Sequence, residues 1–231
     1  MDLAKIKAAV RRVIRRHAEA FEAIGSNQSK LLELASITGF AVHYKAKDFA
    51  VRVHNPRGKA YFAIKASTSG DPWNFSYFSA RKEDLAVELH MNLKVRSAHD
   101  TGVYCVDVGV VTADAIPKAK PAERWDCLPN DALVTFGEAK KLVVYPMLLA
   151  QFVGIVHEIK PAFLRPLTIP QGDHPAPTLI ALGHFSGNAR AIVDAYRTRN
   201  ISVNIAANYD VRLASVRWSP APKSPFYSDE V

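Results

Sequence analysis

The segment 87–96 sets the strongest limit on the fold, because apolar and polar side chains alternate along its whole length. Successive side chains of a β-strand point to opposite faces, so this pattern predicts a strand with one buried face and one polar face. A turn signal over residues 99–102 and an apolar run over 103–111 follow, which together predict an antiparallel hairpin. If the hairpin closes symmetrically about its turn, Asn92 lies opposite Asp107 on one face.

Shorter patterns on either side of this hairpin predict the remaining elements. Helical spacing of apolar residues predicts helices over residues 3–24, 26–39, 146–159 and 188–199. Short β-branched and aromatic segments predict strands over 40–45, 49–54, 60–67, 73–78, 133–140, 178–185 and 201–206. Residues 113–131 are rich in Pro, Lys and Ala and predict a long loop. The expected fold class is α/β, with a mixed, mostly antiparallel central sheet flanked by helices.

Composition narrows the class of protein. The chain has 231 residues, of which 48% are hydrophobic, so it can bury a substantial core. Its two cysteines cannot build a disulfide framework or a four-cysteine zinc site. Neither a membrane-length apolar run nor a secretory signal pattern is visible, so we expect a cytoplasmic protein. The net charge of +8 favours a polyanionic partner such as nucleic acid.

The expected organisation has three parts. These are an N-terminal basic amphipathic helix over residues 1–25, one α/β domain over 26–218 and a loose C-terminal tail over 219–231. The first helix carries six cations against three acids and so contributes +3 to the net charge. This face is either an ordinary solvated surface or a surface that faces phosphates.

Three charged residues on apolar strands are the best candidates for chemistry. Asp107 lies inside an apolar run, and Glu138 and Lys140 lie two apart, hence on one face, at the end of another. Burying a carboxylate is costly unless a cation or hydrogen-bond donors accompany it. The two acids are suited to hold Mg²⁺, and the lysine to orient or deprotonate an attacking water or to steady charge on phosphorus. A second Glu-x-Lys, at Glu158 and Lys160, falls at a predicted helix end, where solvated charges are common.

These residues resemble the PD-(D/E)xK nuclease superfamily, which includes many restriction endonucleases and Holliday-junction resolvases. Its members carry an acid on an early helix, an Asp on a strand after a hairpin, and (D/E)-x-K on the next strand. A helix with a Gln or basic residue often follows. The matching positions here are Glu33, Asp107, Glu138, Lys140 and Gln151, so the resemblance covers residues 26–160 and implies a restriction-endonuclease-like core.

The resemblance implies a role for each matching residue. Asp107 and Glu138 would bind Mg²⁺, for which Mn²⁺ can substitute, and the carbonyl of Ala139 would be a further ligand. Lys140 would activate or position the water, Glu33 would aid metal or water binding, and Gln151 would stabilise the site. Two departures are a Val106 in place of the motif's Pro and extra strands between Glu33 and Asp107. Glu88, on the same hairpin face as Asp107, is the alternative to Glu33.

The expected function is a metal-dependent endonuclease that hydrolyses phosphodiester bonds of DNA, in restriction or antiviral defence. The expected partner is double-stranded DNA, and the resemblance also implies a homodimer or a partner protein. The residues expected to bind phosphates are Arg11, Arg12, Arg15, Arg16, Arg52, Arg57, Lys94 and Arg96. Three alternatives remain open: structural ion pairs, a noncatalytic nucleic-acid-binding module or subunit of a larger complex, and a nuclease switched on by a ligand or partner. Trp73, Phe75 and Tyr77 could stack on bases, although core or edge packing is the commoner outcome for such residues.

Overall fold

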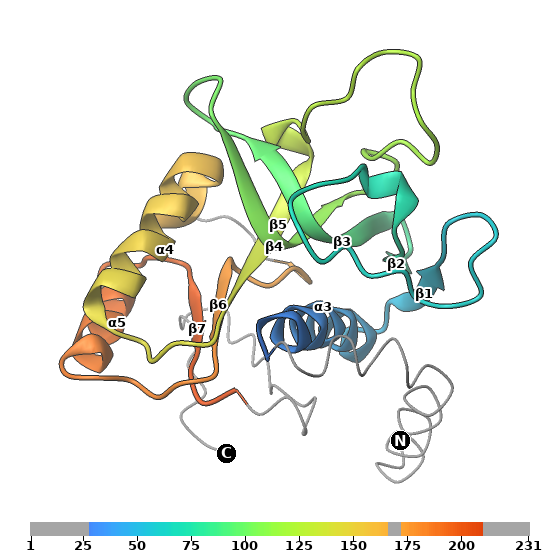
Figure 1. Ribbon diagram of the computed structural model, residues 1–231. Coiled ribbons are helices and arrows are strands. Elements are labelled where there is room, and N and C mark those ends of the chain that lie inside the picture. Colours follow the sequence, from blue (N-terminus) through green and yellow to red (C-terminus); the bar gives the residue numbers. More distant parts are fainter. Residues whose placement is uncertain (1–27, 166–171, 210–231) are drawn as a thin grey trace, which may run out of the picture.

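One seven-stranded sheet organises the computed structural model, which describes residues 28–165 and 172–209 (Figure 1). The strands lie side by side in sequence order, and their bounds are β1 Ala50–His54, β2 Tyr77–Lys82, β3 Leu85–Arg96, β4 Val103–Thr112, β5 Leu133–Lys140, β6 Thr178–Ala181 and β7 Asn204–Ala206. The first five strands pair antiparallel, whereas β6 and β7 join in parallel. The α/β class with a mixed, mostly antiparallel sheet is therefore confirmed.

Parallel neighbours need a crossover connection, and a helix supplies each of the two. Helix α4, Pro146–Ile159, connects β5 to β6, and helix α5, Ala189–Thr198, connects β6 to β7. Pro146 occupies the first turn of α4, where its missing N–H is not needed, and Pro161 follows the helix end. The predicted strand–helix–strand ending is confirmed, although β6 and β7 are shorter than predicted.

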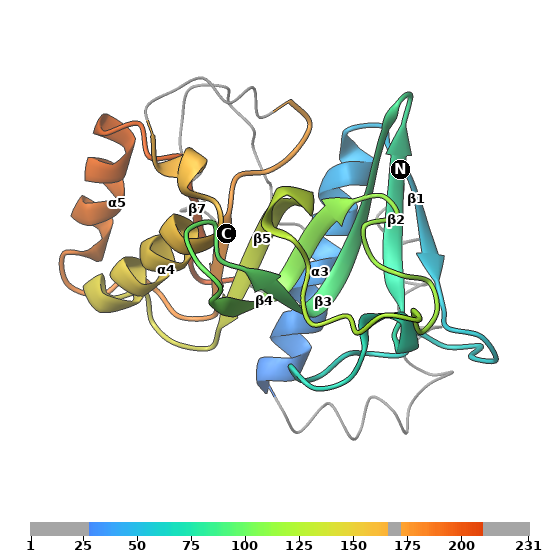
Figure 2. The same ribbon diagram turned by 90° about the horizontal axis from the view of Figure 1, so that it is seen from above.

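Two apolar cores lie against the sheet, with helices on both of its sides (Figure 2). Helix α3, Gln28–Ala46, packs on one face, and α4 and α5 pack on the other. The neighbouring residues Leu179 and Ile180 of β6 belong to different cores, as alternation along a strand requires. Both faces of the sheet are therefore buried over much of its area.

The predicted hairpin is present as β3 and β4, but only the far end of its polar face, at Lys94 and Arg96, is solvent-exposed. Glu88, His90 and Asn92 are all buried, because the long loop and the segment before β2 lie over them. Lys118 of the loop pairs with Glu88, and Lys65 donates to the carbonyl of Asn92. These three polar residues therefore lie inside the protein. The alternation of apolar and polar residues in the sequence could not distinguish such a buried polar face from a solvent-exposed one.

Two predicted strands are wrong, and the one predicted over 73–78 is displaced, because Pro72–Asn74 form a 3-10 helix and β2 runs over Tyr77–Lys82. Residues 40–45 belong to α3, which continues through Gly39 to Ala46. Ile37, Phe40, Ala41 and Tyr44 have helical spacing, and all four are buried in the core that α3 forms with the sheet. Residues 60–67 follow the predicted turn at Asn55-Pro56-Arg57-Gly58 but form no strand.

Several expectations lie outside the described residues. They are the N-terminal helix with Arg11, Arg12, Arg15 and Arg16, and the tail over 219–231. None of the described helices combines the length and apolarity that a membrane span requires.

Candidate functional site

Asp107 and Glu138 come together where β4 and β5 separate. The last paired residues between these strands are Val108 and Gly137, while β5 continues to pair with β6 as far as Lys140. Beyond the last pair, the Ala139 N–H donates to Asp107 Oδ2 at 2.8 Å instead of to a backbone carbonyl. The Asp107 carboxylate thus takes the place of a missing ladder hydrogen bond, and the two strands open beside it.

Lys140 bridges the two carboxylates. Its Nζ lies 2.7 Å from Glu138 Oε2 and 3.3 Å from Asp107 Oδ2. The side chains differ in depth: Glu138 is 5% exposed, Asp107 18% and Lys140 35%. The three predicted residues therefore form one cluster that runs from the interior to the solvent.

The protonation of this cluster is unusual. Burial, together with the nearby charge of Asp107, raises the pKa of Glu138 to about 7. Burial acts to lower the pKa of Lys140, but Glu138 and Asp107 together raise it well above its ordinary value. Lys140 is therefore a cation at neutral pH, and in this arrangement it serves as a charge rather than as a base.

Glu138 also has an unsatisfied oxygen. Its Oε1 is buried and has no hydrogen-bond partner among the described residues. A buried acceptor without a donor costs about 1–3 kcal/mol, more for a charged group, so native structures rarely leave one. This atom is the clearest sign that the cluster is built to meet a group that the described residues do not supply.

Within the described part of the chain, no hydrogen bond or ion pair joins Glu33 to Asp107, Glu138 or Lys140. Asn92 Nδ2 donates to Glu33 Oε2 at 2.9 Å, and Lys30 pairs with Glu33 Oε1 at 2.9 Å. The β3–β4 pairs Met91–Val108 and Leu93–Val106 flank Asn92 and Asp107, and the φ of +48° at Asn92 marks a local irregularity of the strand. Glu33 is therefore held against β3 at Asn92.

Glu88 and Gln151 are not brought to the cluster. Glu88 pairs with Val111 in the β3–β4 ladder, four residues along β4 from Asp107, and binds His90 and Lys118. Although burial opposes it, these two hydrogen-bond donors lower the pKa of Glu88. Gln151 is exposed on α4, and no hydrogen bond within the described part of the chain joins it to Asp107, Glu138 or Lys140.

Two further residues of the site were not among the sequence candidates for chemistry. Lys65 is almost fully buried and donates to the carbonyls of Ser67 and Asn92 at 2.7 and 2.9 Å, and burial lowers its pKa. Cys105, two residues from Asp107, has a thiol whose pKa burial raises to about 11; Lys65, Asp107, Glu138 and Lys94 all act electrostatically on it. Lys65 comes from an irregular segment, so no periodic signal could have placed it here.

The described basic candidates are all exposed. Arg52 lies on β1, Arg57 in the turn that follows it, and Lys94 and Arg96 on β3. Lys94 pairs directly with Cys105, so it shares a strand face with Asp107. Of these cations, Lys94 has the clearest relation to the acidic cluster.

The donor atoms suit a small, hard cation. Two carboxylates on neighbouring strands, one with a bare buried oxygen, offer the oxygen ligands that Mg²⁺ prefers. Over residues 28–165 and 172–209, no group of three or more His, Cys, Asp or Glu side chains is gathered. A bound ion would therefore take its remaining ligands from backbone, such as Ala139, from water or from substrate.

Comparisons with protein-family models, with curated proteins and with solved structures found no match to this chain.

Proposed function

We propose that this chain is a metal-dependent nuclease that hydrolyses phosphodiester bonds of DNA at Asp107, Glu138 and Lys140. One observation carries the proposal: two carboxylates meet where their strands diverge, one lysine bridges them, and Glu138 Oε1 is buried without a donor among the described residues. An arrangement that served only as a structural ion pair would be expected to satisfy that oxygen.

The order of the elements supports the same proposal. A helix with a buried acid, Glu33 of α3, precedes the β3–β4 hairpin that carries Asp107. The next strand, β5, carries Glu138 and Lys140, and helix α4 follows it. This is the order that the PD-(D/E)xK resemblance leads us to expect, and it favours a restriction-endonuclease-like core over residues 26–160.

Each residue has a role in the proposed chemistry. Asp107 and Glu138 would hold Mg²⁺ or Mn²⁺, which when bound polarises a phosphate and lowers the pKa of water. Lys140 reaches outward from both acids, so its ammonium would stabilise charge on the reacting phosphate or position the attacking water. Asn92 would position Glu33 beside this site through their hydrogen bond.

The test is cleavage of plasmid, linear duplex and single-stranded DNA in Mg²⁺, in Mn²⁺ and in EDTA. We expect metal-dependent cleavage by the wild-type chain and a loss of at least about 100-fold in Lys140→Ala and Asp107→Asn, because charge stabilisation at the reacting centre is a large catalytic term. Circular dichroism checks that both variants fold.

Matched controls make the cleavage result specific. Lys141→Ala removes an exposed lysine next to Lys140, and Asp84→Asn removes the charge of an exposed aspartate. Both controls should cleave at wild-type rates. Undiminished metal-dependent cleavage by folded Lys140→Ala would show that the catalytic site lies elsewhere.

A noncatalytic nucleic-acid-binding module is the second candidate. The observation that favours it is that Lys140 already forms an ion pair with each carboxylate, as a purely structural cluster would. Under this alternative the chain binds DNA, no metal produces cleavage, and Lys140→Ala lowers the free energy of unfolding without any change in product.

A further inference from the structure

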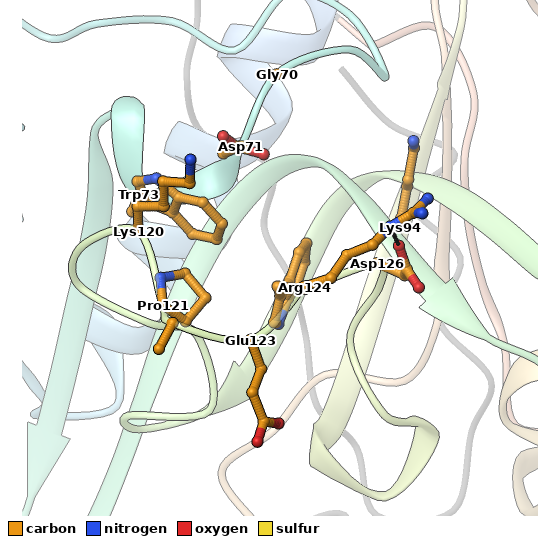
Figure 3. Close-up of a pocket in the computed structure, with 11 residues that line it drawn as sticks. Gly70, Asp71, Trp73, Lys94, Lys120, Pro121, Glu123, Arg124 and Asp126 are labelled. Carbon is orange, nitrogen blue, oxygen red and sulfur yellow. Dashed lines mark hydrogen bonds and ion pairs between the residues drawn. The ribbon is translucent and has the colours of Figure 1, made fainter.

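We propose that the pocket walled by Trp73 and Trp125 binds an unpaired nucleotide of the substrate strand, next to the acidic cluster. The inference rests on the proposed nuclease function and adds to it a substrate class, a strand that presents at least one unstacked base. The pocket has a volume of about 510 Å³, within the range of small-molecule sites (Figure 3).

Two indoles give the pocket its aromatic character. Trp73 and Trp125 meet edge to face, with ring centroids 6.0 Å apart and ring planes at 78°. Both side chains are only partly buried, so the contact leaves ring surface open. A nucleobase has a π-face of its own and stacks on such surfaces whatever its identity.

Cations line the same pocket. In Figure 3, Lys120 lies beside Trp73, and Lys94 and Arg124 lie across the pocket from them. Neither Lys94 nor Lys120 forms an ion pair with a described residue, whereas Arg124 pairs with Asp126 at 2.7 Å. Two ammonium groups near aromatic rings match a nucleotide, which carries a base and a phosphate a short distance apart.

The pocket lining carries three carboxylates against its three cations, but only Asp126 is ion-paired with one of these cations. Asp126 is paired with Arg124, and Glu123 points away from the other labelled side chains in Figure 3. Asp71 remains at the rim, where it can accept a hydrogen bond from the amino group of a base.

The pocket lies close to the proposed catalytic residues. Lys94 pairs with Cys105 on β4, and Cys105 and Asp107 are one strand repeat apart, about 7 Å, on the same face. Electrostatic effects of Lys94, Asp107 and Glu138 all reach the Cys105 thiol. A nucleic-acid strand whose base enters the pocket would therefore bring a neighbouring phosphate near Asp107 and Glu138.

The walls of the pocket are held in place. The wall that carries Lys120 and Trp125 is fixed at one side by the pairing of Lys118 with Glu88. At the other side, the Leu128 N–H donates to the carbonyl of Lys94 at 2.8 Å. A preformed pocket binds its ligand without first ordering the loop, which favours a binding role over an incidental gap.

The experiment measures binding of labelled dT8 and U8 single strands and of a 16-base-pair duplex to the full chain in EDTA, where metal-dependent cleavage cannot occur. Fluorescence anisotropy reports the dissociation constants. We expect Trp125→Ala to weaken single-strand binding about 5- to 150-fold, which corresponds to the loss of one base–aromatic stack. Trp125→Phe should keep affinity within about threefold, since a smaller aromatic ring still stacks. Comparison of dT8 with U8 distinguishes DNA from RNA as the source of the strand.

A second variant keeps the proposal testable if the Trp125→Ala chain does not fold. Lys120→Glu changes an exposed side chain and should also weaken single-strand binding, whereas Tyr61→Ala, an exposed aromatic that does not line the pocket, should not. Wild-type affinity in both Trp125→Ala and Lys120→Glu overturns the proposal, and so does tight binding of duplex with none of single strands. The cleavage assay tests the nuclease function separately. Metal-dependent cleavage together with unchanged single-strand binding in both pocket variants would overturn the nucleotide-binding proposal and leave the nuclease proposal standing.

Discussion

At the scale of the residue, Glu138 should give the metal-free protein a distinctive pH dependence. The pKa of this carboxyl is about 7 in the folded chain, against an ordinary value of 4.5. Between these values the folded chain holds a proton that the unfolded chain has released, so the free energy of unfolding falls as pH rises. The expected decrease from pH 5 to pH 8 is about 2–3 kcal/mol. Lys140 is charged in both states throughout this window and does not contribute.

Urea unfolding in EDTA at several pH values measures this effect. Glu138→Gln keeps the shape of the side chain but does not titrate, so its unfolding free energy should vary less between pH 5 and pH 8. Identical pH profiles for the wild-type and variant chains would mean that the Glu138 carboxyl is already ionised at pH 5.

The residues of the cluster differ in how far the sequence could predict them. Asp107, Glu138 and Lys140 interrupt apolar strands, and a strand's alternation fixes which side chains share a face. The position of Asn92 near Asp107 could be predicted from a symmetric closure of the hairpin. The position of Lys65 could not be predicted, because Lys65 comes from a segment without periodicity and its place depends on the tertiary fold.

At the scale of the element, the packing of α3 on β5 depends on Gly137. A Cβ atom at this position would lie 2.7 Å from Cε2 of Phe40, whose side chain is fully buried and cannot move aside cheaply. We expect Gly137→Ala to lower the free energy of unfolding by about 1–3 kcal/mol, as overpacking commonly does. Thermal or urea unfolding measures the change.

Gly154 provides the matched control for this prediction. It lies within α4, where an added Cβ would meet nothing within 4 Å. Gly154→Ala should raise stability by up to about 1 kcal/mol, because alanine is the better helix former. Equal effects of the two substitutions would contradict the close contact between Phe40 and β5.

The same helix shows why some elements could not be predicted. Residues 37–44 satisfy both a helical spacing and an aromatic, strand-like composition, so local pattern alone was ambiguous. Burial of Phe40 and Tyr44 against the sheet favours the helix. By contrast, α4 was predicted correctly, because Pro146 and Pro161 mark its ends independently of the packing.

At the scale of the whole molecule, the sheet has two regions with different sequence signals. The antiparallel region, β1 to β5, includes a long alternating hairpin, and the parallel region, β5 to β7, shows alternating strand and helix patterns. These signals were sufficient for the fold class. They could not show that Glu88, His90 and Asn92 of β3 are covered, since that depends on where a long loop and an irregular segment fold back.

The basic surplus of the whole chain leads to a prediction about salt. Each phosphate contact by a cation contributes about 0.7 to the negative slope of log affinity against log salt for a single strand. Lys94→Gln should therefore reduce that slope by about 0.7, whereas Trp125→Ala should lower affinity and leave the slope unchanged, because stacking releases no counterions. Lys45→Gln, an exposed lysine of α3 that does not line the pocket, is the control. Anisotropy titrations of dT8 from about 50 to 200 mM salt give the slopes. Equal slopes for the Lys94→Gln and Lys45→Gln variants would show that Lys94 contacts no phosphate. The proposed electrostatic contribution of Lys94 to nucleotide binding would then be wrong.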